Sequence, residues 1–211
     1  MIFFNCQIAL FRDFYQKQVV EIKIPIAYSI TMQELTKEHV LKIMENYGND
    51  PQQLIAVLLD IQAASGSNHV EQKWAALTST VLNVPLSKIY DVLTFYAMFN
   101  IEKRGEYIIE ICRSTPCYFG NGDDATNDDK ASKTAVVVQW FEAASSIKMG
   151  ETSADGKISL FYTSCVGACD IGPVAKIGDD VFGNLTETKV KELVELCRSG
   201  NSEGLSKLCQ N

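Results

Sequence analysis

Four cysteines in the second half of the chain have the residue type and the spacing that could bind a soft metal. Four residues separate the members of the first pair, and three separate the members of the second pair. Each pair follows a short apolar run that is typical of a strand, so two pairs of thiolates could converge on one centre. Cysteine sulfur suits zinc or an iron–sulfur cluster. The candidate ligands are Cys112, Cys117, Cys165 and Cys169.

The residues around these cysteines favour an iron–sulfur cluster but leave zinc open. A Rieske centre needs two histidines, and the two in this chain, His39 and His69, lie in its first half. Structural zinc usually sits in C-x2-C knuckles, which are tighter than these loops, and thioredoxin-like catalysis also needs that spacing. Gly167 and Ala168 let backbone N–H groups approach the sulfurs, which suits a cluster. We therefore favour [2Fe–2S] and keep a zinc-stapled interaction module as the alternative.

Composition excludes several classes of protein. The chain has 211 residues, a net charge of -7 and a pI near 4.9. This acidity argues against a nucleic-acid partner. Because no run of about eighteen apolar residues occurs, we expect no membrane span. An odd number of cysteines, without the features of a signal peptide near the start, predicts a reducing cytoplasmic location.

The pattern of apolar residues divides the chain into three parts. Residues 1–30 form a leader that matches no clear pattern, residues 31–103 are predicted to form a helical bundle, and residues 104–211 are rich in strands. In the helical part we expect Asp50, Asn68 and Ser87 to cap helices. The strand-rich part predicts the order β-α-β-β-β-α, with a polar insertion at 121–133. The fold class is therefore α+β.

Four segments resemble the thioredoxin-like [2Fe-2S] ferredoxin family. That family includes the 24 kDa subunit of respiratory complex I and the small subunits of NAD-linked hydrogenases and formate dehydrogenases. The resemblance covers about residues 33–197, and the segments at 1–30, 121–133 and 198–211 depart from it. The similar segments are C-R-S-T-P-C at 112–117, G-E-T-S-A-D-G-K-I-S-L at 150–160, S-C-V-G-A-C-D-I-G-P-V at 164–174, and the stretch at 87–96 that ends in T-F-Y.

The resemblance implies a function and a set of partners. All four cysteines would ligate one [2Fe–2S] cluster, which would exchange single electrons near a flavoprotein subunit that holds FMN and binds NAD(P)H. Further Fe–S subunits are expected, and the helical half would pack on the flavoprotein. A soluble hydrogenase, formate dehydrogenase or electron-bifurcating assembly is favoured over a complex I 24 kDa-type subunit or a free ferredoxin shuttle. No catalytic residues are expected in this chain.

The remaining cysteines and aromatic residues are assigned to structural roles or left open. Cys197 lies on the apolar stripe of the last predicted helix, and it and both tryptophans are expected in the core. Cys6 and Cys209 are expected to be bystanders. A further group could serve either as core or as a docking surface for the partner: Thr94, Phe95, Tyr96 and Phe99.

Overall fold

The computed structural model describes residues 35–119 and 132–209. The predicted leader at 1–30 and most of the predicted insertion at 121–133 lie outside these ranges. The described residues combine helices with one sheet, so the prediction of a mixed helical and sheet fold is confirmed. Within these ranges, no helix has both the length and the apolar content needed to cross a membrane.

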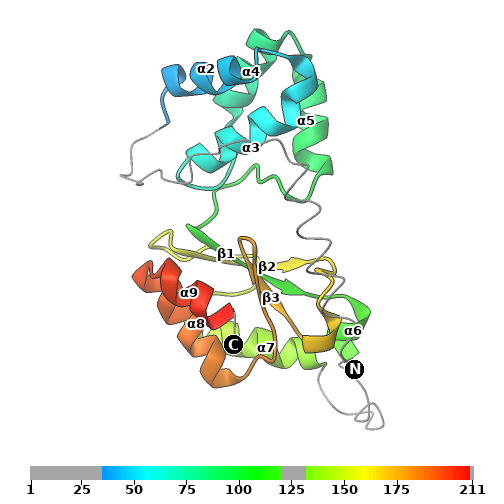
Figure 1. Cartoon of the computed structure of the whole chain (residues 1–211), viewed down its shortest axis with the longest axis vertical. Helices are drawn as coiled ribbons and strands as arrows, with labels where there is room; N and C mark the ends of the chain where they lie inside the picture. Colours follow the sequence, from blue (N-terminus) through cyan, green and yellow to red (C-terminus); the bar gives the residue numbers. More distant parts are fainter. Residues whose placement is uncertain (1–34, 120–131, 210–211) are drawn as a thin grey trace. The chain divides into compact units, whose positions relative to one another are not determined.

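The first described region is helical (Figure 1). Its elements are α2 (Lys37–Asn46), the 3-10 helix η1 (Pro51–Gln53), α3 (Leu54–Ala64), α4 (Gln72–Leu82) and α5 (Leu86–Phe95). Asp50 caps η1 as predicted, because its side chain accepts a hydrogen bond from the backbone N–H of Gln52 at 2.9 Å.

Two of the predicted helix caps are wrong. Asn68 does not cap α4; its backbone is left-handed, with a φ of 46°, and its amide nitrogen donates to the carbonyl of Gly105 at 2.7 Å. Glu71 therefore precedes α4 without a side-chain cap. Ser87 lies inside α5, which begins one residue earlier, directly after Pro85. Pro85 fixes the start because its φ of -53° suits a residue that leads into a helix.

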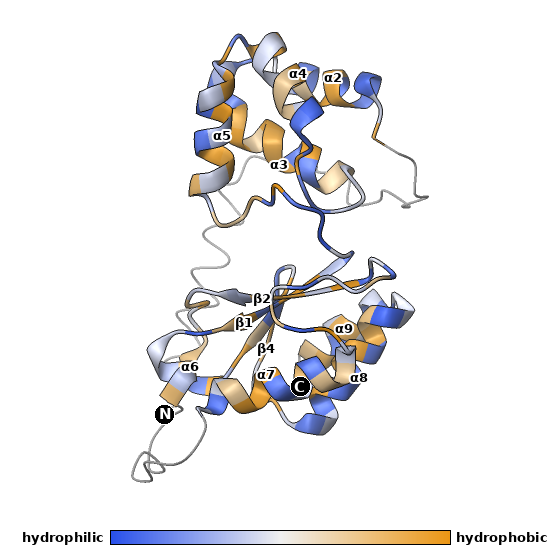
Figure 2. Ribbon diagram, turned by 180° about the vertical axis from the view of Figure 1, so that it is seen from behind, coloured by the Kyte–Doolittle hydropathy of each residue, from blue (hydrophilic) through white to orange (hydrophobic). Residues whose placement is uncertain are grey.

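An apolar core joins the four α-helices of this region. Figure 2 shows that α3 is largely apolar, which is typical of a helix that is surrounded by other parts of the protein. Trp74 belongs to this core, as predicted, with 7% of its surface exposed. The aromatic residues near the end of α5 differ in burial, since Phe99 is 6% exposed and Phe95 is 79% exposed. The fully buried members of this core are Val40, Met44, Val57, Leu58, Ile61, Ala75 and Ile89.

A four-stranded sheet with the order β2-β1-β3-β4 dominates the second region. The pair β1 and β2 is parallel, whereas β3 pairs antiparallel with both β1 and β4. The strands are β1 (Tyr107–Cys112), β2 (Ile158–Thr163), β3 (Ala175–Ile177) and β4 (Asp180–Phe182). The helices are α6 (Thr115–Phe119), α7 (Lys133–Ser145), α8 (Glu187–Ser199) and α9 (Ser202–Cys209), with a 3-10 helix η2 at Cys169–Ile171.

Helices α7 and α8 cover one face of this sheet (Figure 1). Both begin with a side-chain cap, Ser132 for α7 and Thr186 for α8. The sequence pattern did not predict the short helices α6 and α9. Cys197 is fully buried in this core, as predicted. Trp140 is partly buried and packs against the same core. The core residues from the strands and from α7 include Ile109, Ile111, Ile158, Leu160, Val137 and Phe141.

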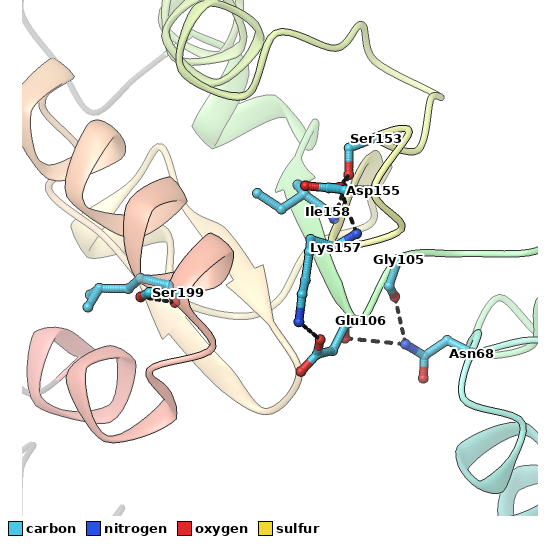
Figure 3. A network of polar contacts seen from close by, with 9 residues as sticks. Asn68, Gly105, Glu106, Ser153, Asp155, Lys157, Ile158 and Ser199 are labelled. Carbon is cyan, nitrogen blue, oxygen red and sulfur yellow. Dashed lines mark hydrogen bonds and ion pairs between the residues drawn. The ribbon is translucent and has the colours of Figure 1, made fainter. Parts of the chain in front are cut away.

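The chain enters β1 through a segment that backbone and polar contacts hold in place (Figure 3). Asn68 donates to the carbonyls of Gly105 and Glu106, and Glu106 forms an ion pair with Lys157. The Gly105 N–H donates to Ser159 Oγ at 2.7 Å, and a side chain on Gly105 would lie 2.8 Å from the backbone of Ile158. Only glycine fits this close approach. The division of the chain at 103/104 stays a prediction.

Candidate metal centre

The parallel register of β1 and β2 brings the starts of both cysteine loops together at the carboxyl ends of these two strands. Cys112 is the last residue of β1 and lies opposite Thr163, the last residue of β2. Cys165 follows two residues later. Because parallel strands point the same way, the loops that follow them begin side by side. Strand pairing, rather than closeness in the sequence, therefore places the two cysteine pairs together.

The first cysteine loop is short and tightly bonded. The N–H of Cys112 donates to the carbonyl of Val174 at 3.0 Å, and the N–H of Arg113 donates to the carbonyl of Thr163 at 3.2 Å. Cys117 lies on helix α6. Pro116 lies in the first turn of this helix, where an N–H has no intrahelical partner, so proline costs no hydrogen bond there. Cys112 and Cys117 are each 1% exposed. The first pair is thus fully inside the protein.

The second cysteine loop is irregular and lies nearer to solvent. Gly167 takes a φ of 86°, which glycine adopts without the steric cost of a side chain. Cys165 is exposed and Cys169 is partly exposed, and their Sγ atoms lie 3.8 Å apart. Two sulfurs bound to one tetrahedral metal at about 2.3 Å are separated by about 3.8 Å. The second pair is therefore spaced as two ligands of one metal.

The protonation behaviour of the thiols links the two pairs. Burial opposes ionisation of Cys112, but hydrogen bonds from the Ser114 N–H and from Cys117 lower its pKa overall. Burial, followed by the hydrogen bond to Cys112, raises the pKa of Cys117 to about 11. A hydrogen bond to Cys165 raises the pKa of Cys169, and the charge of Cys112 adds to this. The structure thus brings all four predicted cysteines within electrostatic range of one another.

Backbone N–H groups from both loops point at the buried sulfurs. Those of Ser114 and Val166 hydrogen-bond to Cys112, and that of Val174 hydrogen-bonds to Cys117. Val166 belongs to the second loop and Cys112 to the first, so one of these bonds joins the loops. Such bonds stabilise negative charge on sulfur, which is the environment expected around a thiolate-bound metal or cluster.

Gly172 leaves space beside the sulfurs that any side chain would fill. A Cβ at this position would lie 3.2 Å from Cys117 Sγ and 3.2 Å from the carbonyl oxygen of Cys169. The sequence pattern drew attention to Gly167 and Ala168 and missed Gly172. Its neighbour Pro173 was a signal that the loop is constrained here. The donor set and this space fit a group bound through four thiolates.

Apolar residues shield the inner side of the four-cysteine site, and aromatic residues are exposed around its loops. Val174 is 1% exposed and packs on Cys112 and Cys117, with Val166 and Ile171 partly buried beside them. Phe119 and two tyrosines next to the loops are 43–65% exposed, and the Arg113 guanidinium lies over one of these rings. The tyrosines are Tyr118 and Tyr162. Within the described ranges, no three histidine, cysteine, aspartate or glutamate side chains are arranged around a single ion position.

Most of the chain matches a known protein family. Residues 40–198 match the family described as "Thioredoxin-like [2Fe-2S] ferredoxin". The matched range contains all four cysteines of the site and ends near the close of α8.

Individual relatives come from two kinds of enzyme. The chain is 32% identical to a subunit of the NADH-quinone oxidoreductase of Rickettsia felis, over 67% of this chain and 77% of the relative. It is 28% identical to a subunit of the NADP-reducing hydrogenase of Solidesulfovibrio fructosivorans, HndA, over 83% of this chain and 94% of the relative.

Solved structures show the same fold. A chain of an NAD+-reducing [NiFe]-hydrogenase in the air-oxidized state superposes with a TM-score of 0.57 at 20% identity. The match covers 72% of this chain and 24% of that chain, so it spans about a quarter of the solved chain's length.

Proposed function

The chain belongs to the thioredoxin-like [2Fe-2S] ferredoxin family, and on this premise we propose that its four clustered cysteines hold one [2Fe–2S] cluster. The convergence of the four thiols at one edge of the sheet carries this proposal. In such a cluster each iron takes two cysteines, and the chain supplies two pairs, the second with its sulfurs 3.8 Å apart. The ligands would be Cys112, Cys117, Cys165 and Cys169.

When bound, this cluster supplies the exchange of single electrons. The residues of the chain hold it and set its surroundings. The N–H groups of Ser114, Val166 and Val174 offset negative charge on the inner sulfurs, and the apolar side chains around them keep water away from that side. The exposed second loop leaves a short path from the sulfurs to the protein surface.

We place this site in an electron-transfer subunit of a multisubunit NAD(P)H-linked oxidoreductase. Relatives of both named kinds are subunits of such enzymes. We favour a cytoplasmic complex, namely a soluble hydrogenase, a formate dehydrogenase or an electron-bifurcating assembly, with a complex I 24 kDa-type subunit as the alternative. FMN and NAD(P) would bind in a flavoprotein partner, further Fe–S subunits would accept or supply electrons, and this chain would convert no substrate itself.

An exposed apolar segment at the end of α5 and directly after it supports contact with a partner protein. Phe95 is 79% exposed, and Met98 and Ile101 are 51% and 52% exposed. The segment is nevertheless held firmly, because Gln62 donates to the carbonyl of Met98 at 2.9 Å and accepts from the N–H of Asn100 at 2.7 Å. An apolar surface that is fixed in advance costs little entropy when it docks. We assign residues 31–103 as a helical bundle that docks and residues 104–211 as the cluster domain.

The test is the metal content and spectrum of the full chain purified without oxygen. We expect about two irons and two sulfides per chain and a rhombic signal in electron paramagnetic resonance after reduction with dithionite. Cys165→Ser should lose the cluster, whereas the matched control Cys209→Ser should keep it. A colourless chain with one zinc would establish the structural zinc module instead. Equal iron in both variants would overturn the ligand assignment.

A further inference from the structure

Strand β4 forms one end of the sheet, and no other strand in the described ranges pairs with its outer side. Ile177 and Asp180 close the two-residue turn between β3 and β4, and Lys176 lies opposite Val181. Hydrogen-bonded and non-hydrogen-bonded pairs alternate along such a ladder, starting with a bonded pair at the turn. Val181 therefore directs its N–H and C=O away from β3. Exposed groups of this kind are a template for pairing with another chain.

Helix α9 covers this edge. It packs against β4 and α8, and Leu205 reaches into the core beneath the sheet, where it is 4% exposed. At its end, Cys209 Sγ donates to the outward carbonyl of Val181 at 3.3 Å. Glu203 and Lys207 lie on its exposed side, so the helix presents charged side chains to solvent.

The start of α9 fixes its close approach to α8. Asn201 Oδ1 accepts a hydrogen bond from the N–H of Gly204 at 2.9 Å. A Cβ on Gly204 would lie 2.6 Å from Leu196 Cδ2, so glycine allows the two helices to come together. The helix as a whole lies beyond residues 40–198, the range of the family match.

We propose that α9 is an edge cover, which prevents the β4 strands of two copies of this chain from pairing with each other. Two identical edges can pair antiparallel about a twofold axis, which gives a closed dimer. The edge cover would keep the subunit free of such self-pairing. It would act in the same way whichever metal the cysteines hold.

The first test removes the edge cover. A chain that ends at Gly200 is compared with the full chain by light scattering after size-exclusion chromatography, over a range of protein concentrations. The full chain should keep one mass, and the shortened chain should rise toward twice its own mass as concentration increases. Adding Val181→Pro to the shortened chain should restore the monomer, because proline removes the outward N–H without touching the ladder to β3. A shortened chain that stays monomeric throughout would overturn the proposal.

A second variant decides the question if the shortened chain does not fold. In the full chain, Gly204→Val should push α9 from α8 and produce the same concentration-dependent dimer. The matched control is Ser206→Val, the same final side chain at an exposed position of the same helix; it should keep one mass. Self-association that persists when Val181→Pro is added to Gly204→Val would show that β4 is not the contact, and would contradict the proposal.

Discussion

The two cysteine pairs of the site differ in their burial and in the secondary structure that carries them. Cys112 and Cys117 are each 1% exposed, lie on a strand and a helix, and receive backbone hydrogen bonds. Cys165 is exposed, Cys169 is partly exposed, and their loop has no regular structure apart from η2. The first pair is part of the protein core, whereas the second closes over it from the solvent side.

This difference means that the two pairs should contribute differently to the stability of the fold, although both are proposed to bind the metal. A substitution in the buried pair disturbs packing and hydrogen bonds that exist without metal. A substitution in the outer pair removes a proposed ligand but few other contacts. The stability of the metal-free chain therefore tests the comparison, and metal content alone does not.

The largest effect is expected for serine substitutions measured in the metal-free chain. Cys117→Ser should lower the free energy of unfolding by about 2 kcal/mol, because it buries a hydroxyl that the site does not fully satisfy. Cys165→Ser should change it by less than about 0.5 kcal/mol, as is usual at an exposed position. Urea unfolding followed by circular dichroism measures both values. Equal losses would break the comparison.

A smaller effect is expected at Gly172, which lies beside both pairs. Gly172→Ala would place a methyl group 3.2 Å from Cys117 Sγ. We expect a loss of about 1 kcal/mol from overpacking, together with a shifted absorption spectrum of the metal-loaded chain. The control is Gly178→Ala in the β3–β4 turn, where a Cβ meets no atom within 4 Å but the φ of 60° is unfavourable. It should lower stability without a spectral shift, and an unshifted Gly172→Ala spectrum would contradict the assigned position.

The smallest effect concerns the dependence of folding stability on pH. It defines the pH range in which the stabilities of the cysteine variants should be compared. Burial lowers the pKa of His69 below its ordinary value of 6.5. The unfolded chain thus binds this proton more readily, so stability is full above pH 6.5 and falls as pH drops through the lower folded pKa. His69→Gln should flatten this part of the stability profile, measured by urea unfolding at a series of pH values. An unchanged slope would show that other groups cause it.

The clustering of the four cysteines was predictable from sequence because each pair follows a recognisable strand and lies in a short motif. The asymmetry between the pairs was not, since the burial of Cys112 and Cys117 depends on Val174 and on the second loop folding back. A helix that begins at Ser87 was expected, but apolar spacing alone could not tell that Phe99 is buried and Phe95 exposed.

The wrong cap at Asn68 and the missed helix α9 have a common physical cause, which is contact with residues far away in the sequence. Asn68 has the sequence signature of a cap, yet its amide bonds Gly105, thirty-seven residues away, which no local pattern reveals. Helix α9 was missed because it is short and has glycine near its start. Its stability comes from packing on α8 and β4, and tertiary contacts of this kind routinely override local propensity.

The parallel register of β1 and β2 also has a consequence for how this gene can change. Each cysteine pair is anchored to its own strand end, so the distance between the pairs in space does not depend on the number of residues that join them. Each doubling of a flexible connection costs only about 0.6 kcal/mol in closure entropy. Evolution, or an experimenter inserting a fluorescent label, can therefore lengthen the chain between α6 and α7 while the sulfurs keep their positions.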